Sequence, residues 1–251
     1  MRRIFIALAT LTLWFGSVSP GLADAFSPDQ KKELEGLIRS YLLEHPEILR
    51  EVATALDAKD KKTADDQRGE VLTSSAKALF HDDIDAVVGN PKGDVTMVEF
   101  MDYNCSYCRK SFKEMQAILE TDKNVRVVMK EFPIFGEGSE YAARAALASS
   151  RQGKYWALHQ ALFEFQGQVT PAVVDQVAKQ VGLDVAKLKT DMKDPAIASN
   201  IGKTTELAQS MQFTGTPAFL IDSTVIPGYV TKDVLMAAIA TVRANGGCKA
   251  C

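Results

Sequence analysis

The stretch VEFMDYNCSYCRKSF, residues 98–112, holds two cysteines separated by two residues, where an apolar run gives way to a basic, amphipathic one. The apolar run predicts a buried strand, and the residues after the pair predict a helix. If Tyr103 and Asn104 form the turn between them, Cys105 lies at the N-terminus of that helix. Unpaired N–H groups and the helix dipole favour a thiolate there, and lower a cysteine pKa from about 8.5 into a range of about 3.5–7.5. We therefore expect Cys105 to attack a disulfide, and Cys108, one turn further on and facing the protein, to resolve the mixed disulfide.

A glutamate, Glu99, precedes Cys105 by six residues within the predicted strand. Strand alternation turns its side chain away from its two apolar neighbours and towards the helix that bears the cysteines. Burial raises the pKa of a carboxyl group, so Glu99 is expected to relay a proton to or from Cys108. Lys130, in the next predicted strand, is its expected charge partner. The alternative is a solvated residue at the end of the strand.

Strands and helices alternate around this stretch as a βαβ unit, a helical block, a β-hairpin and a closing helix, which are the parts of a thioredoxin-like sheet. Predicted strands are VTMVEFMDY at 95–103, VRVVMKEF at 125–132, PAFLID at 217–222 and TVIPGYV at 224–230; residues 139–211 predict helices, 82–94 lead into a turn at 90–93, and a last helix begins after Thr231. We therefore predict an α/β, thioredoxin-like fold over residues 81–245. It carries a helical insertion at about 136–211 and a flexible tail at 246–251.

The first residues, MRRIFIALATLTLWFGSVSPGLADAFS, predict a cleaved signal peptide at 1–25, because a basic start, an apolar run and a small-x-small site follow one another. The apolar run is shorter than the ~20 residues of a spanning helix. Residues 26–80 predict amphipathic helices that begin after Ser27 and break at Pro46, with a solvated helix or hinge in the charged stretch 57–70. Their apolar stripe is too small to be buried alone and predicts an oligomerisation segment; packing back on the main domain is the alternative.

Composition narrows the function classes. A hydrophobic share of 46% fills an ordinary core, which excludes the disulfide-dense miniproteins. The net charge of −3, with mixed signs, gives no case for nucleic acid or an anionic membrane surface as a partner. The four cysteines form two pairs of identical spacing, which in an oxidising compartment indicates redox work more than scaffolding.

The second pair, Cys248 and Cys251, follows two glycines and lies in the predicted flexible tail. A four-cysteine zinc knuckle made of both pairs is the main rival, and it is disfavoured because the gap between the pairs far exceeds the usual ~15–20 residues. We favour a local disulfide, and the alternative is a shuttle dithiol that exchanges with Cys105. No metal site is predicted, although Cu(I) binding by the reduced thiolates stays a secondary hypothesis.

Two further groups of residues lie outside the predicted redox pair. The three histidines, His45, His81 and His159, are scattered along the chain and predict surface or interface positions, not ligands. Met101 and Tyr103, just before the first pair, are expected either to form an apolar lip for unfolded substrate or to pack inside.

The segment TGTPAF, residues 214–219, places Pro217 directly before a predicted strand, a position typical of a tight turn. Together FMDYNCSYCRK with its upstream glutamate, the helical insertion, TGTPAFLID and the leader IRSYLLEHPEIL resemble the DsbA-like branch of the thioredoxin superfamily, and are most similar to its ScsC-like and outer-membrane-protein-like homologues. The resemblance implies that Cys105 is the nucleophile, Cys108 the resolving thiol and Glu99 the buried acid. It also implies that Thr216–Pro217 is a cis-proline loop that faces the pair and binds the extended backbone of the substrate.

Between the two cysteines lie Ser106 and Tyr107, which carry no formal charge and are expected to contact substrate. They should stabilise the thiolate less than an intervening histidine does. The family most often has proline where Ser106 stands, so this chain departs from the pattern there. A threonine at position 216 resembles the isomerase members more than the strong oxidase, which carries valine. Some ScsC-like members form trimers through the leader, and this favours the oligomerisation segment.

These observations predict an exported, periplasmic thiol–disulfide oxidoreductase that exchanges disulfides with unfolded or misoxidised secreted proteins and uses no organic cofactor. An oligomer is expected to act as an isomerase or reductase, because linked domains present several thiols around one substrate. It then needs a membrane reductase of the DsbD or ScsB kind to keep Cys105 reduced. A monomer is expected to act as a DsbA-type oxidase recharged by a DsbB-like membrane oxidant. The non-enzymatic alternative is a copper-sequestering thiol protein.

Overall fold

The computed structural model describes residues 26–251, and the predicted signal peptide at 1–25 lies outside them. Contacts divide the described residues into two compact units, which meet between Lys59 and Asp60. Among residues 26–251, none of the helices combines the length and the apolar character that a bilayer crossing requires.

In the first unit, helix α1, Pro28–Glu44, starts at the predicted capping box. The Ser27 hydroxyl accepts from the backbone N–H of Gln30, and the Gln30 side chain accepts from the backbone N–H of Ser27. A new helix, α2, Glu47–Phe80, begins directly after Pro46. No residue of α1 is buried. Eight large apolar side chains of α1 and the start of α2 are 41–69% exposed: Leu34, Leu37, Ile38, Tyr41, Leu43, Leu49, Val52 and Leu56.

Helix α2 continues into the second unit, and the charged stretch 57–70 is helical throughout. The helix is interrupted at Ser75, whose backbone angles (φ −117°, ψ 15°) are not helical. Beyond this kink, Leu79 and Phe80 are fully buried. The units therefore divide at Lys59, not at residue 80 as the sequence predicts, because the end of α2 supplies core side chains to the second unit.

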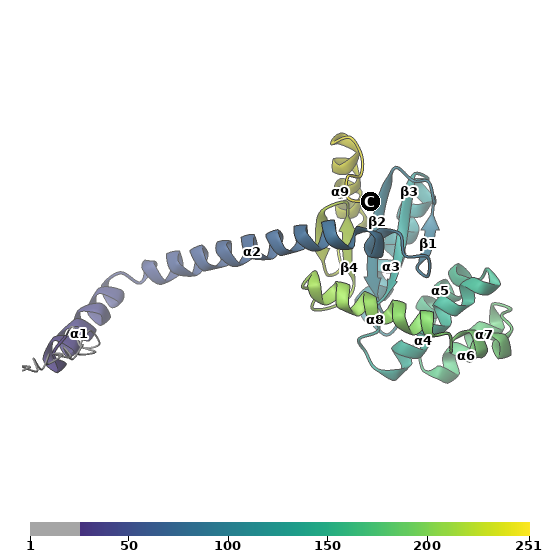
Figure 1. Ribbon diagram of the computed structural model, residues 1–251, viewed down its shortest axis with the longest axis horizontal. Helices are drawn as coiled ribbons and strands as arrows, with labels where there is room; N and C mark the ends of the chain where they lie inside the picture. Colours follow the sequence, from purple (N-terminus) through teal and green to yellow (C-terminus); the bar gives the residue numbers. More distant parts are fainter. Residues whose placement is uncertain (1–25) are drawn as a thin grey trace, which may run out of the picture. The chain divides into compact units, whose positions relative to one another are not determined.

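Within the described residues, five strands form one mixed sheet in the order β1-β3-β2-β4-β5. Figure 1 labels the first four of them. Their bounds are β1 Ala86–Gly89, β2 Val95–Met101, β3 Val125–Glu131, β4 Ala218–Ile221 and β5 Thr224–Pro227. Strands β2 and β3 are parallel and are joined through helix α3, Ser106–Thr121, whereas β4 runs antiparallel to β2. The predicted thioredoxin-like fold is confirmed.

The sequence analysis missed strand β1, because it interpreted residues 82–94 only as the approach to a turn. Four residues are a short signal, and β1 is fixed by pairing with β3 from Ala86 opposite Met129 to Gly89 opposite Arg126. Gly89 itself has a positive φ of 78°, and a Cβ there would lie 2.5 Å from the carbonyl oxygen of Val125. Glycine is therefore required where β1 passes into the turn.

The two faces of the sheet bury different helices. Met97 and Met101 of β2 join a core with α3 and with the last helix, α9, Lys232–Ala244. Val98 and Phe100 join a second core with the end of α2 and with α8, Pro195–Ser210. This alternation along β2, whose residues are all buried, determines which side chains lie beneath the cysteines.

The helical insertion lies between β3 and β4, as the sequence predicts (Figure 1). Its elements are α4 Glu137–Ser149, the 3-10 turn Ser150–Gln152, α5 Tyr155–Glu164, α6 Pro171–Gln180, α7 Val185–Asp191 and α8. Small side chains on α4, Ala142, Ala145 and Ala146 among them, are fully buried, so the neighbouring helices pack closely around it.

Candidate active site

Cys105 is the N-cap residue of α3 and lies where the sequence analysis places it. Its backbone is extended (φ −80°, ψ 119°), and its Sγ accepts from the backbone N–H of Cys108 at 3.3 Å. The Cys108 thiol, together with N–H groups of the first turn, lowers the pKa of Cys105 to about 6. Cys105 and Cys108 are free thiols in the structure. At neutral pH the sulfur of Cys105 is therefore predominantly an anion.

Cys108 lies one turn further along α3 and is fully buried. Burial raises the pKa of its thiol above the ordinary value, so Cys108 is protonated while Cys105 is ionised. Together with Phe112, Met115 and Ile118, it forms the buried stripe of α3. A buried thiol needs a base before it can attack.

Glu99 is 2% exposed and lies beneath α3. The hydroxyl of Ser111, one turn after Cys108, donates to Glu99 Oε1 at 3.0 Å. Burial raises the pKa of Glu99 to about 7, so the carboxyl group can hold or release a proton at physiological pH. The solvated alternative for Glu99 is wrong.

Lys130 is not the charge partner of Glu99, contrary to the sequence analysis. It lies opposite Phe100 in the register, on the other face of the sheet, because β2 and β3 pair in parallel. There its ammonium group pairs with the buried carboxylate of Asp85, which also accepts from Asn200 at 3.0 Å. Lys130 therefore lies in the second core, and among residues 26–251 no cation pairs with Glu99.

A cis peptide bond joins Thr216 and Pro217, as the family resemblance implies. The carbonyl oxygen of Thr216 lies 3.2 Å from Cys105 Sγ. The two residues between the cysteines, Ser106 and Tyr107, are exposed, and Tyr107 is 55% accessible. The Thr216 carbonyl thus borders the Cys105 sulfur, and two exposed residues follow Cys105 directly in the chain.

Asp102 is a positioning residue that sequence reasoning missed. Its carboxylate Oδ1 accepts from the N–H of Asn104 and from the hydroxyl of Ser139, both at 2.7 Å. Oδ2 accepts from the N–H groups of Ile134 and Phe135 at 2.7 and 3.1 Å. The turn before the nucleophile is thereby tied to the start of the insertion. An aspartate directly after a buried strand was the available signal, since such residues commonly hydrogen-bond the backbone two residues on.

Tyr103 and His159 are buried, so the surface position expected for His159 is wrong, and Tyr103 follows the packed alternative instead of the lip. Tyr103 does not form a lip, because its hydroxyl donates to Glu131 at 3.0 Å and lies 3.0 Å from Nδ1 of His159. Met101 is likewise fully buried. Burial lowers the pKa of His159 to about 3, so the imidazole is neutral among the aromatic rings of α5 and α3.

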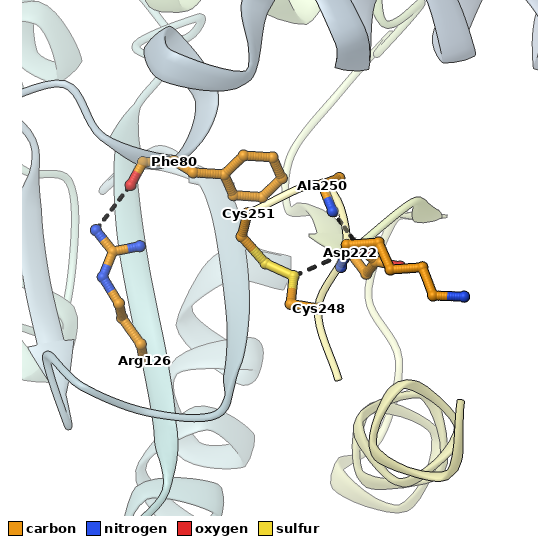
Figure 2. The surroundings of a disulfide bond; sticks show 7 residues. Phe80, Arg126, Asp222, Cys248, Ala250 and Cys251 are labelled. Atoms are coloured by element: carbon orange, nitrogen blue, oxygen red, sulfur yellow. Dashed lines mark hydrogen bonds between the residues drawn. A yellow bond between two sulfur atoms is a disulfide. The ribbon is translucent and has the colours of Figure 1, made fainter. Parts of the chain in front are cut away.

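The second pair forms the local disulfide Cys248–Cys251 (Figure 2). Asp222, in the turn between β4 and β5, accepts from the N–H groups of Lys249 and Ala250, both at 2.7 Å. The tail predicted to be flexible therefore has defined contacts.

The two pairs lie at opposite ends of β4. Thr216 borders Cys105, and Asp222 follows Thr216 by six residues of largely extended chain, or about 20 Å. The structure has the local disulfide that the sequence favours, and the shuttle dithiol stays an untested hypothesis.

Comparison with protein families matches residues 96–240 to the DSBA-like thioredoxin domain. Residues 30–62 match the N-terminal domain of the copper resistance protein ScsC. The first match spans the sheet, both cysteines of the first pair and the insertion, and the second lies within the helical leader.

Solved structures of similar proteins are consistent with both family matches. A thioredoxin-like oxidoreductase from Silicibacter pomeroyi DSS-3 is 45% identical, with 67% of this chain and 97% of that chain covered and a TM-score of 0.66. A linker-deletion mutant of ScsC from Proteus mirabilis is 27% identical, with 89% and 99% covered and a TM-score of 0.68. A periplasmic thioredoxin-like protein from Salmonella enterica serovar Typhimurium is 31% identical, with 67% and 95% covered and a TM-score of 0.62.

Among curated proteins, the chain spans about a quarter of the length of a Na(+)/H(+) antiporter NhaA from Salinispora tropica, at 28% identity over 66% of this chain and 26% of the relative. Disulfide bond formation protein D from Bacillus subtilis is 28% identical over 59% of this chain and 72% of that protein. The chain belongs to the DsbA-like thioredoxin domain family and carries a ScsC-type N-terminal domain.

Proposed function

We propose that the chain is a periplasmic disulfide isomerase and reductase that acts on unfolded or misoxidised secreted proteins. The observation that carries this proposal is the Cys105 sulfur at the start of α3, beside the carbonyl oxygen of Thr216, in a chain whose helix α1 exposes large apolar side chains. Domains linked through such a surface would present several thiolates around one substrate, which favours isomerisation. The pKa of Cys105, lowered to about 6, keeps its sulfur anionic at neutral pH.

The reaction begins with the Cys105 thiolate, which attacks one sulfur of a substrate disulfide. A mixed disulfide forms between Cys105 and the substrate, and the other substrate sulfur leaves as a thiolate. In isomerisation this thiolate attacks a second substrate disulfide, and a substrate thiolate finally displaces Cys105. No net electrons are transferred.

In reduction, Cys108 resolves the mixed disulfide. Its thiol gives a proton to Glu99, and the resulting thiolate attacks Cys105 Sγ. The Cys105–Cys108 disulfide forms while the substrate leaves with two reduced sulfurs. The pKa of about 7 suits Glu99 to this exchange, and the Ser111 hydroxyl orients its carboxyl group.

The substrate is expected to lie in extended form across the cis-proline loop. The Thr216 carbonyl next to Cys105 and the exposed Ser106 and Tyr107 support this placement. Backbone pairing with such a loop accepts many sequences, which suits an enzyme for unfolded proteins.

The exposed apolar side chains of α1 support a homo-oligomer, with a trimer as the expected form. Linked domains hold several Cys105 thiolates near one scrambled substrate. Continued turnover then requires a membrane reductase of the DsbD or ScsB kind. The signal-peptide pattern at 1–25 and the periplasmic name of the Salmonella relative support export.

The deciding experiment compares refolding of scrambled and of reduced ribonuclease by the same protein in a glutathione buffer. We expect faster recovery from scrambled ribonuclease, with little acceleration of the reduced substrate. Acceleration of the reduced substrate alone would instead identify a DsbA-type oxidase with a DsbB-like partner. Stoichiometric Cu(I) retained by the reduced protein and lost in Cys105→Ser, without any exchange activity, would identify the copper-sequestering alternative.

The contribution of the oligomer is tested by Leu37→Glu against Ser40→Glu, since both add one charge to exposed positions of α1. Leu37→Glu should dissociate the oligomer and lower isomerase activity by roughly tenfold or more. Reduction of a small-molecule disulfide should not change. Equal isomerase activity in a monomeric Leu37→Glu protein would refute the role of the oligomer.

A further inference from the structure

The C-terminal pair lies beside a carboxylate that the redox reaction does not use. Donor atoms of Asp222, Cys248 and Cys251 all lie within 4.8 Å of one another. Atoms bound to one tetrahedral zinc ion lie roughly 3.3–3.8 Å apart, given bonds of about 2.0–2.3 Å. Once the disulfide is opened, the three side chains are close enough to bind one ion with small movements.

The carboxylate is already oriented. Asp222 adopts a left-handed conformation (φ 54°) in the turn between β4 and β5. Its Oδ1 accepts from two consecutive N–H groups of the tail, at Lys249 and Ala250, and lies 3.4 Å from Cys248 Sγ. Within the described residues 26–251 no ion pair neutralises Asp222. Such backbone bonds are the kind of outer support that fixes a metal ligand in place.

The tail is also held in position by its apolar surroundings (Figure 2). Cys248 packs against the core beneath α3 and α9, and Cys251 packs against the core that contains Phe80. Both cysteines are half-buried. Gly246 and Gly247, each with a φ near +90°, turn the chain back from α9 so that it reaches this place.

Charge favours a cation at this point. Reduction gives two thiols, and their ionisation places two negative sulfurs beside the Asp222 carboxylate, which makes no ion pair within residues 26–251. A thiolate next to a carboxylate is electrostatically unfavourable. A divalent ion that accepts mixed sulfur and oxygen ligands removes this repulsion, and zinc is the common metal with that preference.

We propose that Asp222, Cys248 and Cys251 form a zinc site that binds the ion when the tail cysteines are reduced and cannot bind it when they form the disulfide. A dithiol reductant supplies two electrons and two protons to the disulfide and becomes a disulfide itself. Zinc then displaces both thiol protons and binds two thiolates, the Asp222 carboxylate and a water molecule. Oxidation of the two thiolates restores the disulfide and releases the ion.

The test uses the full chain with Cys105→Ser and Cys108→Ser, so that only the tail thiols react. After reduction by a phosphine, the protein is titrated with Cd²⁺, whose bonds to thiolates give an ultraviolet charge-transfer band, and then with competing Zn²⁺. We expect one equivalent of Cd²⁺ bound, displacement by Zn²⁺, and no binding before reduction. Native mass spectrometry gives the same stoichiometry independently.

Two variants decide the ligands. Asp222→Asn keeps an oxygen acceptor for the tail N–H groups, and asparagine tolerates the left-handed backbone, so the fold is retained. It should weaken metal binding by at least roughly tenfold. Asp233→Asn removes the same charge from an exposed position of α9 and should leave metal binding unchanged. Thermal unfolding of both confirms that they are folded. Absence of stoichiometric binding, or binding unchanged by Asp222→Asn or by Cys248→Ser, would overturn the proposal.

Discussion

The first CxxC pair opens a helix, whereas the second follows one. Cys105 caps the N-terminus of α3, where N–H groups converge on its sulfur. Cys248 comes after the C-terminus of α9 and lies beside the carboxylate of Asp222. The helix dipole and the local charge therefore favour an anionic sulfur in the first place and oppose it in the second.

The comparison shows that the spacing of two cysteines does not determine their chemistry. Both pairs have two residues between the sulfurs, yet one is a free dithiol in the structure and the other a disulfide. The position of a cysteine relative to a helix, and the charges near its sulfur, determine whether it acts as a nucleophile, forms a structural disulfide or binds a metal. Four predictions test this difference, beginning with the largest effect.

Replacing the nucleophile should remove turnover by several orders of magnitude. Cys105→Ser leaves no thiolate at the start of α3, and we expect the distant tail not to substitute for it. Insulin reduction with a dithiol as electron donor measures the loss. Cys108→Ala is the matched variant, and it should still form the mixed disulfide and accumulate it. If turnover remained and disappeared only when Cys248 was also changed, the second pair would be a redox pair too, and the difference between the two pairs would be refuted.

Glu99→Gln should change the pH dependence of stability in the reduced protein. The pKa of Glu99 is raised from 4.5 to about 7 in the folded protein, because burial favours the protonated carboxyl group. The free energy of unfolding is therefore highest below pH 4.5, and it falls as pH rises through 7 and the buried group ionises. The shift corresponds to roughly 3 kcal/mol at alkaline pH. The variant should therefore gain stability relative to the native chain between pH 5 and pH 8 in urea unfolding. Glu120→Gln, on the exposed side of α3, should show no such gain.

Alkylation should separate the two pairs directly. With its pKa of about 6, Cys105 is ionised about ten to one at pH 7, and its modification rate should fall as pH drops through 6. Reduced tail cysteines, measured in the protein lacking Cys105 and Cys108, should react more slowly at pH 6.5. Iodoacetamide labelling with peptide mass spectrometry gives both rates. Equal rates for the two pairs would show that helix position has no effect here.

Thr216→Val should have the smallest effect. The Thr216 hydroxyl is buried without a hydrogen-bond partner among the described residues, while its carbonyl oxygen borders Cys105. Valine keeps the shape and the carbonyl, so removing the hydroxyl should stabilise the protein by about 1 kcal/mol. Insulin reduction should change by less than about threefold, since backbone contacts are preserved. A larger loss would assign the hydroxyl a role in substrate binding.

The sequence was sufficient for features set by local pattern. Strand alternation places Glu99 beneath α3, and the strand-to-helix transition places Cys105 at a cap. Features set by long-range contacts could not be predicted. Lys130 pairs with Asp85, 45 residues away, because parallel register turns it to the second face.

Long-range contacts also explain the other features that the sequence analysis did not predict. His159 is buried because α5 packs against Tyr103, and no local signal distinguishes that histidine from a surface one. Strand β1 forms because it pairs with the edge of β3. The tail is ordered by Asp222, which the sequence places only in a hairpin turn.

The four bonds accepted by Asp102 have a consequence for protein engineering. Because that carboxylate joins the turn before Cys105 to Ile134, Phe135 and Ser139, the reactive motif and the start of the insertion form one transplantable module. A graft of residues 102–108 alone onto a minimal scaffold would leave the aspartate without three of its four donors. Recipients that also receive residues 132–139 keep the geometry on which the nucleophile depends.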